Sequence, residues 1–182
     1  MNQTSHIKNS LTFRSALKSD FAEILLFPAN KNELFYFSPS ASYPLTLEQL
    51  EKQLSTRHES TVMLDNNQVV GFANFYNVKK HQIAFIGNLI IKPEKRRQGL
   101  ARKLLLMMME KGFKQLQLKE IHLSCFQQNT AAQLLYKQLG FKAYAEETRH
   151  NSDNQAVSLL HLKIKKTDSS QKYISSSGQT IK

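Results

Sequence analysis

The sequence contains only one cysteine, Cys125, among its 182 residues. One cysteine cannot form a disulfide within the chain, and no cysteine and histidine spacing typical of a zinc site is present. We therefore expect neither a disulfide framework nor a metal. For Cys125 itself, a small buried side chain is favoured over a nucleophile.

Long apolar segments are also missing. The first ten residues, MNQTSHIKNS, lack the apolar core of a signal peptide. The most hydrophobic helix candidate, LARKLLLMMMEKGF, is interrupted by charge well before it reaches membrane-spanning length. We expect a cytoplasmic protein with no membrane partner.

Acidic residues are in the minority. The chain has 14 Asp and Glu against 25 Lys and Arg, for a formal net charge of +11. A positive surface favours anionic partners such as phosphates, acidic small molecules or nucleic acid. Charge alone does not choose among them.

The length fits one domain with short ends. Residues 1–10 form a polar extension, residues 11–165 the domain, and residues 166–182 a tail rich in Ser and Lys that we expect to be disordered. Apolar periodicity and turn residues predict the elements of the domain. They are strands at 11–13, 82–91, 120–126, 143–150 and 156–165, a hairpin over 61–78, and helices at 19–27, 47–54, 100–112 and 129–141, with a loop over 27–46.

The order of these elements predicts an α/β (mixed α+β) fold, a mixed sheet with helices on both faces. The segment 82–91 is apolar almost throughout, which is typical of a central strand buried on both faces. Capping signals support three helix starts: Asp20 with Glu23, Thr46 with its glutamine three residues on, and Asn129. Gly140 should end the last helix.

A basic turn separates the central strand from the next helix. At a helix start, unpaired backbone N–H groups point the same way at the positive end of the helix dipole, so the turn can hold an anion. Gly99 would let the backbone approach a bulky phosphate, while Arg96, Arg97 and Arg102 would add mobile charge. A solvated basic surface is the alternative, but it places positive charge at the unfavourable end of the dipole.

Two segments carry a family resemblance. Arg96-Arg97-Gln98-Gly99-Leu100-Ala101 resembles the Gln/Arg-x-x-Gly-x-Gly/Ala pyrophosphate-binding motif of the GNAT superfamily of N-acetyltransferases. NTAAQLLYKQLGF, from Asn129, is similar to the second signature of that family. The likeness covers residues 11–165 and implies a mostly antiparallel, twisted sheet of six to seven strands, splayed at strands four and five.

The resemblance also implies acetyl-CoA as donor. Its pyrophosphate would bind the amides of Gln98, Gly99, Leu100, Ala101 and nearby residues, including Arg96, Arg97 and Arg102. Its pantetheine arm would pair with the backbone of Leu89, Ile90 and Ile91, and Asn129 would reach that arm. Tyr136 would lie near the thioester sulfur and act as general acid, since a phenol with a pKa of about 10 holds its proton at neutral pH.

The base and the acceptor site are less determined. Many GNAT relatives place a carboxylate on strand four or five, where this chain has Asn88, which cannot act as a base. Asn88 would orient water or the acceptor, or be purely structural at a strand irregularity. Glu33 and His58 are loop candidates for help, and the base stays unassigned. Phe35 and Tyr36 would form a wall of the acceptor site or pack over the sheet edge.

The resemblance implies an N-acetyltransferase that acts on a primary amine of a small molecule or of a peptide or protein, and we expect a monomer or homodimer. The alternative is a nucleic-acid-associated protein, either an RNA-binding module or a GNAT-type enzyme that acetylates aminoacyl-tRNA. A plain RNA binder is less favoured because the chain lacks the usual RNA-binding signatures.

Overall fold

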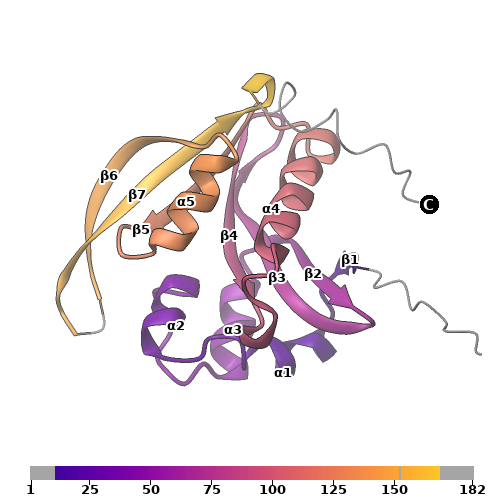
Figure 1. Cartoon of the computed structure of the whole chain (residues 1–182), viewed down its shortest axis with the longest axis vertical. Coiled ribbons are helices and arrows are strands. Elements are labelled where there is room, and N and C mark those ends of the chain that lie inside the picture. The colour runs from indigo at the N-terminus through magenta and orange to yellow at the C-terminus, as the bar shows by residue number, and fades with distance from the viewer. Residues whose placement is uncertain (1–10, 152, 169–182) are drawn as a thin grey trace, which may run out of the picture.

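The computed structural model describes residues 11–151 and 153–168. Its centre is a seven-stranded sheet in the order β1-β2-β3-β4-β5-β7-β6 (Figure 1). Neighbouring strands are antiparallel except β4 and β5, which are parallel. The mixed, mostly antiparallel sheet is therefore confirmed. Its strands are β1 Leu11–Ser15, β2 His58–Asp65, β3 Gln68–Lys79, β4 Ile83–Ile91, β5 Glu120–Phe126, β6 Lys142–His150 and β7 Ala156–Lys165.

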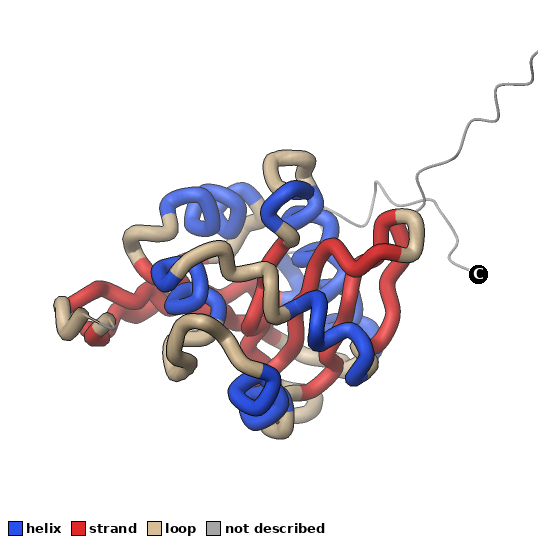
Figure 2. The backbone as a smooth tube through the Cα atoms, turned by 90° about the horizontal axis from the view of Figure 1, so that it is seen from below, coloured by secondary structure: helices blue, strands red, loops and turns tan. Residues whose placement is uncertain are grey.

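Helices lie on both sides of the strands (Figure 2), as predicted. On one face, Leu104 and Leu139 belong to a large hydrophobic core. On the other, Ile24 and Leu50 pack with Phe72 in a second core. The α-helices are α1 Phe21–Ile24, α2 Lys31–Phe37, α3 Leu47–Leu54, α4 Leu100–Glu110 and α5 Thr130–Gln138, with the short helices η1 Lys18–Asp20, η2 Pro93–Lys95 and η3 Lys111–Gln115.

Strand β4 is the fourth of seven strands, so its central place is confirmed. Burial on both faces is not: along β4, buried residues alternate with half-buried ones such as Phe85, Gly87 and Leu89. The strand covered on both faces is β3, where residues 69–75 are all buried. The second face of β4 is partly open because a cleft lies over it.

Strands β4 and β5 separate after a short parallel ladder. Pairing runs from Ile83 with Glu120 to Ile86 with Leu123, although β4 and β5 both continue past it. The register between β3 and β4 also shifts between Gly87 and Ile90, a segment that contains Asn88 with a positive φ of 49°. The predicted splay between the fourth and fifth strands is therefore confirmed.

The first helix differs from its prediction. Asp20 makes no side-chain cap; its carboxylate instead accepts bonds from Arg14 (2.6 and 2.8 Å) and from the backbone N–H of Leu17 (2.7 Å). Glu23 is not a capping-box partner, since it pairs with Lys92 (2.8 Å). The expected helix over 19–27 is consequently a 3-10 turn followed by the single-turn helix α1.

The segment 27–46 is not entirely loop, because it contains α2. Asn30 caps this helix by accepting the backbone N–H of Glu33 (3.0 Å). The Glu33 carboxylate reaches back to the backbone N–H of Ala29 (2.8 Å). An Asn followed three residues later by Glu is a helix-start signal, so α2 could have been predicted from the sequence.

Three other helix ends follow their signals more closely. Thr46 and Asn129 cap α3 and α5 with their side chains, and Gly140, at φ 86°, follows the end of α5.

The helix predicted to end near Gly112 continues beyond it as a π-helical turn. A Cβ at Gly112 would lie 2.7 Å from the Ile121 side chain, so this glycine permits close packing and does not end the helix.

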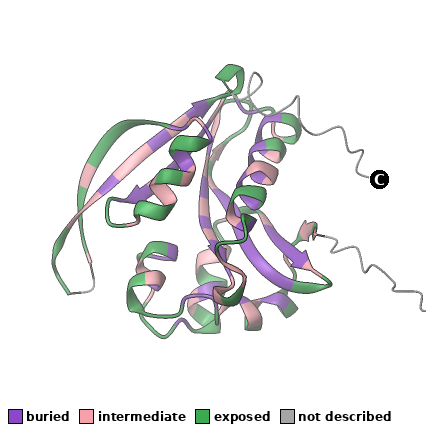
Figure 3. Cartoon of the chain, viewed as in Figure 1, coloured by how far each residue is buried: buried purple, intermediate pink, exposed green. Residues whose placement is uncertain are grey.

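Exposure increases toward one edge of the sheet, where nearly every residue of β6 is exposed (Figure 3). Strand β7 ends at Lys165, where the tail was expected to begin. The predicted extension at 1–10 and residues 169–182 of the predicted tail lie outside the described residues. Within residues 11–151 and 153–168, no helix is long and apolar enough to span a membrane.

Candidate active site

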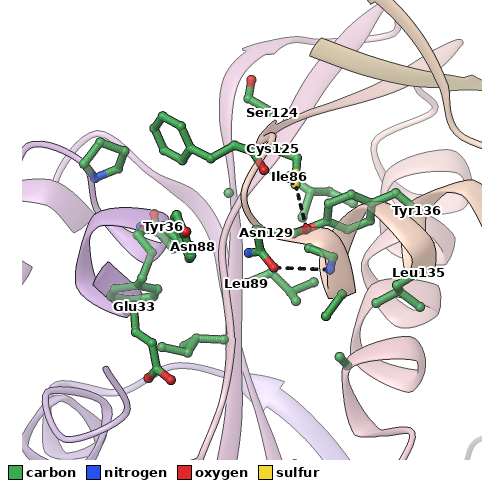
Figure 4. A pocket seen from close by; sticks show the side chains of 18 of the residues that line it. Glu33, Tyr36, Ile86, Asn88, Leu89, Ser124, Cys125, Asn129, Leu135 and Tyr136 are labelled. Atoms are coloured by element: carbon green, nitrogen blue, oxygen red, sulfur yellow. Dashed lines mark hydrogen bonds between the residues drawn. The ribbon is translucent and has the colours of Figure 1, made fainter. Parts of the chain in front are cut away.

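A cleft of about 1170 Å³ opens where β4 and β5 diverge. Residues of α2, β4, β5 and α5 line it (Figure 4). The turn before α4 and parts of β3, β6 and β7 line the same space. All of the predicted site residues except Gln98 are among its lining residues. The splay of the sheet therefore brings together residues from most of the chain.

The first turn of α4 faces this cleft with unpaired backbone groups. Gly99 is its N-cap in a left-handed conformation (φ 74°, ψ 6°), and Lys103 donates to the Gly99 carbonyl (3.2 Å). The amides before Lys103 have no intrahelical acceptor. A Cβ at Gly99 would meet no heavy atom within 4 Å, and the turn contains no acidic residue. This open, positively polarised turn suits an anion.

The side chains of the turn differ in their roles. Arg97 is exposed at φ 58° and lines the cleft together with Arg102. Gln98 folds its side chain back toward the Glu94 carbonyl (3.4 Å). Of Gln98, only the backbone amide is thus placed with the turn. This amide is the group that the family resemblance implied as a ligand of the pyrophosphate.

Arg96 does not carry mobile charge, contrary to expectation. Its guanidinium binds both carboxylate oxygens of Glu33 (2.6 and 2.9 Å). It also donates to the carbonyls of Ile91 and Phe27, each at 3.0 Å. Arg96 therefore fastens the basic turn to α2 and to the end of β4, because these four contacts fix its side chain.

The end of β4 offers an open strand edge to the cleft. Ile90 and Ile91 pair with β3 on one side, opposite Phe72 and Gly71. On the other side, within the described residues, the pairing with β5 stops at Ile86. The backbone of residues 89–91 is therefore able to pair with an extended ligand. Its pairing with a cofactor arm stays a prediction.

Tyr136 extends from α5 toward Cys125 in the cleft (Figure 4). Tyr136 is 9% exposed and is thus more buried than Ala132 and Leu135 on the same helix, which are half-buried. Burial raises the pKa of Tyr136 well above the ordinary phenol value. The hydroxyl is thus firmly protonated at neutral pH, and it is a weaker acid than the sequence argument assumed.

Two neighbours of Tyr136 have defined structural roles. The Asn129 side chain accepts the backbone N–H of Ala132 (3.2 Å), which leaves its amide nitrogen outside the cap. Burial raises the pKa of Cys125 to about 12, so its thiol is protonated at neutral pH. The geometry agrees with the interpretation of Cys125 as a buried side chain.

Asn88 connects the bulge in β4 to α2. Its Nδ2 donates to the carbonyl of Phe37 (2.7 Å), and its Oδ1 accepts from Asn74 Nδ2 (3.0 Å). The residue is buried, with 8% of its surface exposed. Of the two roles considered for Asn88, these contacts favour the structural one.

The two candidate helpers for the base are poorly placed. Glu33 lines the cleft, but the Arg96 guanidinium holds the pKa of its carboxyl below the usual range. His58 is exposed on β2 and is not among the residues that line the cleft. Neither side chain is therefore well placed to accept a proton in the cleft.

Aromatic rings form one wall of the cleft. The ring centroid of Phe35 lies 4.3 Å from that of Phe126, and that of Tyr36 lies 5.9 Å from it. All three residues line the cleft, although Tyr36 keeps 36% of its surface exposed. The predicted pair on α2 thus meets β5 across the opening, a contact that local sequence does not reveal.

A row of polar side chains on the sheet was missed by sequence reasoning. The Ser124 hydroxyl lies 2.9 Å from Nδ1 of His161 and 3.5 Å from the Tyr76 hydroxyl. Nε2 of His161 lies 3.3 Å from the Glu147 carboxylate. All four residues line the cleft. Ser124 and His161 are direct cross-strand partners, so only the pairing of β5 with β7 brings them together.

Comparison with known proteins agrees with this geometry. The sequence model of the acetyltransferase (GNAT) family matches residues 25–141. A spermidine N-acetyltransferase from Vibrio cholerae, in complex with CoA and spermine, is 21% identical with a TM-score of 0.75, covering 87% of this chain and 97% of that chain. An acetyltransferase of the GNAT family from Bacillus anthracis is 17% identical (TM-score 0.70; 87% and 96% covered). A putative acetyltransferase from Salmonella typhimurium with acetyl-CoA is 19% identical (TM-score 0.65; 86% and 94% covered). Because the family model spans more than half of the sequence, this chain belongs to the acetyltransferase (GNAT) family.

Proposed function

We propose that the protein moves the acetyl group of acetyl-CoA to a primary amine of a small-molecule or peptide/protein acceptor. The shared cleft carries this proposal, because an open anion-binding turn, an unpaired strand edge and a tyrosine line the same space. Family membership supports the reaction class. Two structures with the same fold contain CoA or acetyl-CoA, which supports the choice of donor.

The donor occupies the half of the cleft between α4 and α5. Its pyrophosphate rests on the backbone amides of residues 98–101, with Arg97 and Arg102 beside it. The pantetheine arm pairs with the β4 edge at residues 89–91 and meets the amide nitrogen of Asn129. This path brings the thioester to the splay of the sheet, next to Tyr136.

The reaction needs a neutral amine. The acceptor ammonium loses one proton, and its nitrogen then attacks the thioester carbon to form a tetrahedral species. When the carbon–sulfur bond breaks, Tyr136 gives its hydroxyl proton to the departing sulfur and regains one from the nitrogen. Overall, the nitrogen releases two protons, the sulfur takes one, and one leaves to solvent.

We propose that the row of Ser124, His161 and Glu147, on β5, β7 and β6, takes up the first of these protons. The amine proton passes to His161 through the Ser124 hydroxyl, and the Glu147 carboxylate stabilises the resulting imidazolium. The Arg149 guanidinium keeps the pKa of Glu147 low, so Glu147 stays charged and stabilises a cation without taking the proton itself.

Replacing His161 with glutamine should lower kcat/KM about 100-fold at pH 7 without changing acetyl-CoA affinity. The remaining activity should rise about tenfold per pH unit, because the neutral fraction of a free aliphatic amine rises at that rate below its pKa. His122→Gln is the matched control, since His122 lies on the same strand as Ser124 but binds Tyr144 and Glu120 and is not a lining residue. Parallel pH profiles for His161→Gln and the unchanged protein would remove His161 from this role.

A screen of amines with acetyl-CoA tests the function as a whole. Free thiol released from acetyl-CoA should appear with some amines and be absent without an acceptor. Acetyl-CoA should also raise the melting temperature, because a ligand that binds only the folded state stabilises it. No thiol release from any amine, together with salt-sensitive nanomolar RNA binding that acetyl-CoA does not affect, would overturn the proposal in favour of an RNA-binding protein.

A further inference from the structure

Among the described residues, Arg57 lines the cleft without a carboxylate partner. It lies between α3 and β2, where its backbone N–H donates to the Leu54 carbonyl (3.0 Å). Its guanidinium carbon is 4.7 Å from the centroid of the Tyr76 ring, and both residues line the cleft. The Arg57 Nε is buried and has no hydrogen-bond partner. A buried N–H without an acceptor is costly, so the protein alone does not satisfy this guanidinium.

Two of the other arginines that line the cleft have the carboxylate partner that Arg57 lacks. Arg96 binds Glu33 and Arg149 binds Glu147, in both cases with distances below 3 Å. Among the described residues, no carboxylate forms an ion pair with Arg57. Burial lowers the pKa of Arg57, because the interaction with Tyr76 compensates only part of the loss of water around its charge.

The carboxylates of the cleft do not suit a polycation. Glu33 and Glu147 are the only acidic residues among the described residues that line it, and both already bind an arginine. The Vibrio cholerae relative in fold was solved with spermine, which carries only positive charges. An acceptor of that kind would meet Arg57 here as a like charge.

We propose that Arg57 binds an anionic group of the acceptor, so that the substrate is a small amine carrying a carboxylate. This inference rests on the proposed acetyltransferase function and names its substrate class. Because Tyr76 connects Arg57 to Ser124 on the same face of the sheet, the carboxylate binds at Arg57 while the amine points toward Ser124 and the splay. A planar guanidinium that stacks on an aromatic ring keeps its N–H fork available for such a partner.

Matched acceptors test this selectivity. Thiol release is measured with α-amino acids and straight-chain ω-amino carboxylates, with the amide of each, and with diamines and spermidine. We expect kcat/KM for at least one amino carboxylate to exceed that of its amide at least tenfold. In Arg57→Gln this ratio should fall below threefold, whereas Arg57→Lys should keep part of it. Lys52→Gln, an exposed site on α3 outside the lining residues, removes the same charge and should leave the ratio unchanged.

The outcomes separate this inference from the proposed function. Thiol release with equal kcat/KM for carboxylates and amides, or a preference for diamines, would overturn the role of Arg57 while leaving the acetyltransferase intact. An unchanged ratio in Arg57→Gln would do the same. Thiol release from no amine at all would overturn the proposed function instead.

Discussion

Replacing Gly99 with glutamate should weaken acetyl-CoA binding at least 100-fold, which corresponds to about 2.7 kcal/mol. Gly99 is the N-cap of α4, and no heavy atom lies within 4 Å of the position of its missing Cβ. A glutamate there would point a carboxylate into the space proposed for the pyrophosphate. Like charges would then meet at the positive end of the helix, where an anion is otherwise stabilised. Isothermal titration with acetyl-CoA measures the loss.

Gly99→Gln is the control that separates charge from backbone strain. Both variants place a non-glycine residue at φ 74°, which costs about 1 kcal/mol of stability, and their side chains are nearly equal in size. The two should therefore melt at similar temperatures, while the glutamine variant keeps most of the affinity that glutamate loses. Equal affinities in Gly99→Glu and the unchanged protein would place the pyrophosphate elsewhere.

Tyr136→Phe should lower kcat 100-fold to 1000-fold and leave acetyl-CoA affinity unchanged. The phenylalanine ring fills the same buried space, so only the hydroxyl that we propose as the proton donor is lost. General acid catalysis by one positioned group contributes about 10² to 10⁴. Because burial raises the pKa of this phenol, the unchanged enzyme should keep Tyr136 protonated throughout the neutral range. Single-turnover thiol release measures the chemical step directly.

Tyr144→Phe provides the comparison for this substitution. Tyr144 is 46% exposed, and its hydroxyl lies 2.9 Å from Nδ1 of His122. Neither residue lines the cleft. Its kcat should stay within twofold of the unchanged protein. If Tyr136→Phe behaves like Tyr144→Phe, Tyr136 is a packing residue and the sulfur takes its proton from another source.

Most of the sheet could be predicted from local pattern. The hairpin at residues 61–78 and the strand pair at the end of the chain follow from alternating apolar residues and turn residues, which act over a few positions. The helix α2 was missed because prolines and aromatic residues around it resemble a loop, although Asn30 and Glu33 carry a start signal. The extension of α4 through Gly112 depended on close packing against Ile121, which no local pattern contains.

The candidate site likewise combines features that neighbouring residues predict with features that depend on residues far apart in the sequence. The turn at Gly99 is a contiguous motif, so its geometry follows from neighbouring residues. The fixed role of Arg96 could not be predicted, because its partner Glu33 is 63 positions away. Ser124 and His161 are likewise unremarkable in sequence and become partners only through the pairing of β5 with β7.

Because Arg96 is paired with Glu33, alanine substitutions at the basic residues of the turn would not all act in the same way. An alanine at Arg97 removes a cation that faces the proposed donor site, whereas an alanine at Arg96 separates α2 from the turn and leaves the Glu33 carboxylate without its arginine partner. Equal losses of donor affinity at the two positions would thus have different origins. A second substitution, Glu33→Gln, should restore part of the donor affinity of an Arg96 variant and leave that of an Arg97 variant unchanged. Suppression of this kind therefore distinguishes a residue that holds the turn in place from one that contacts the donor.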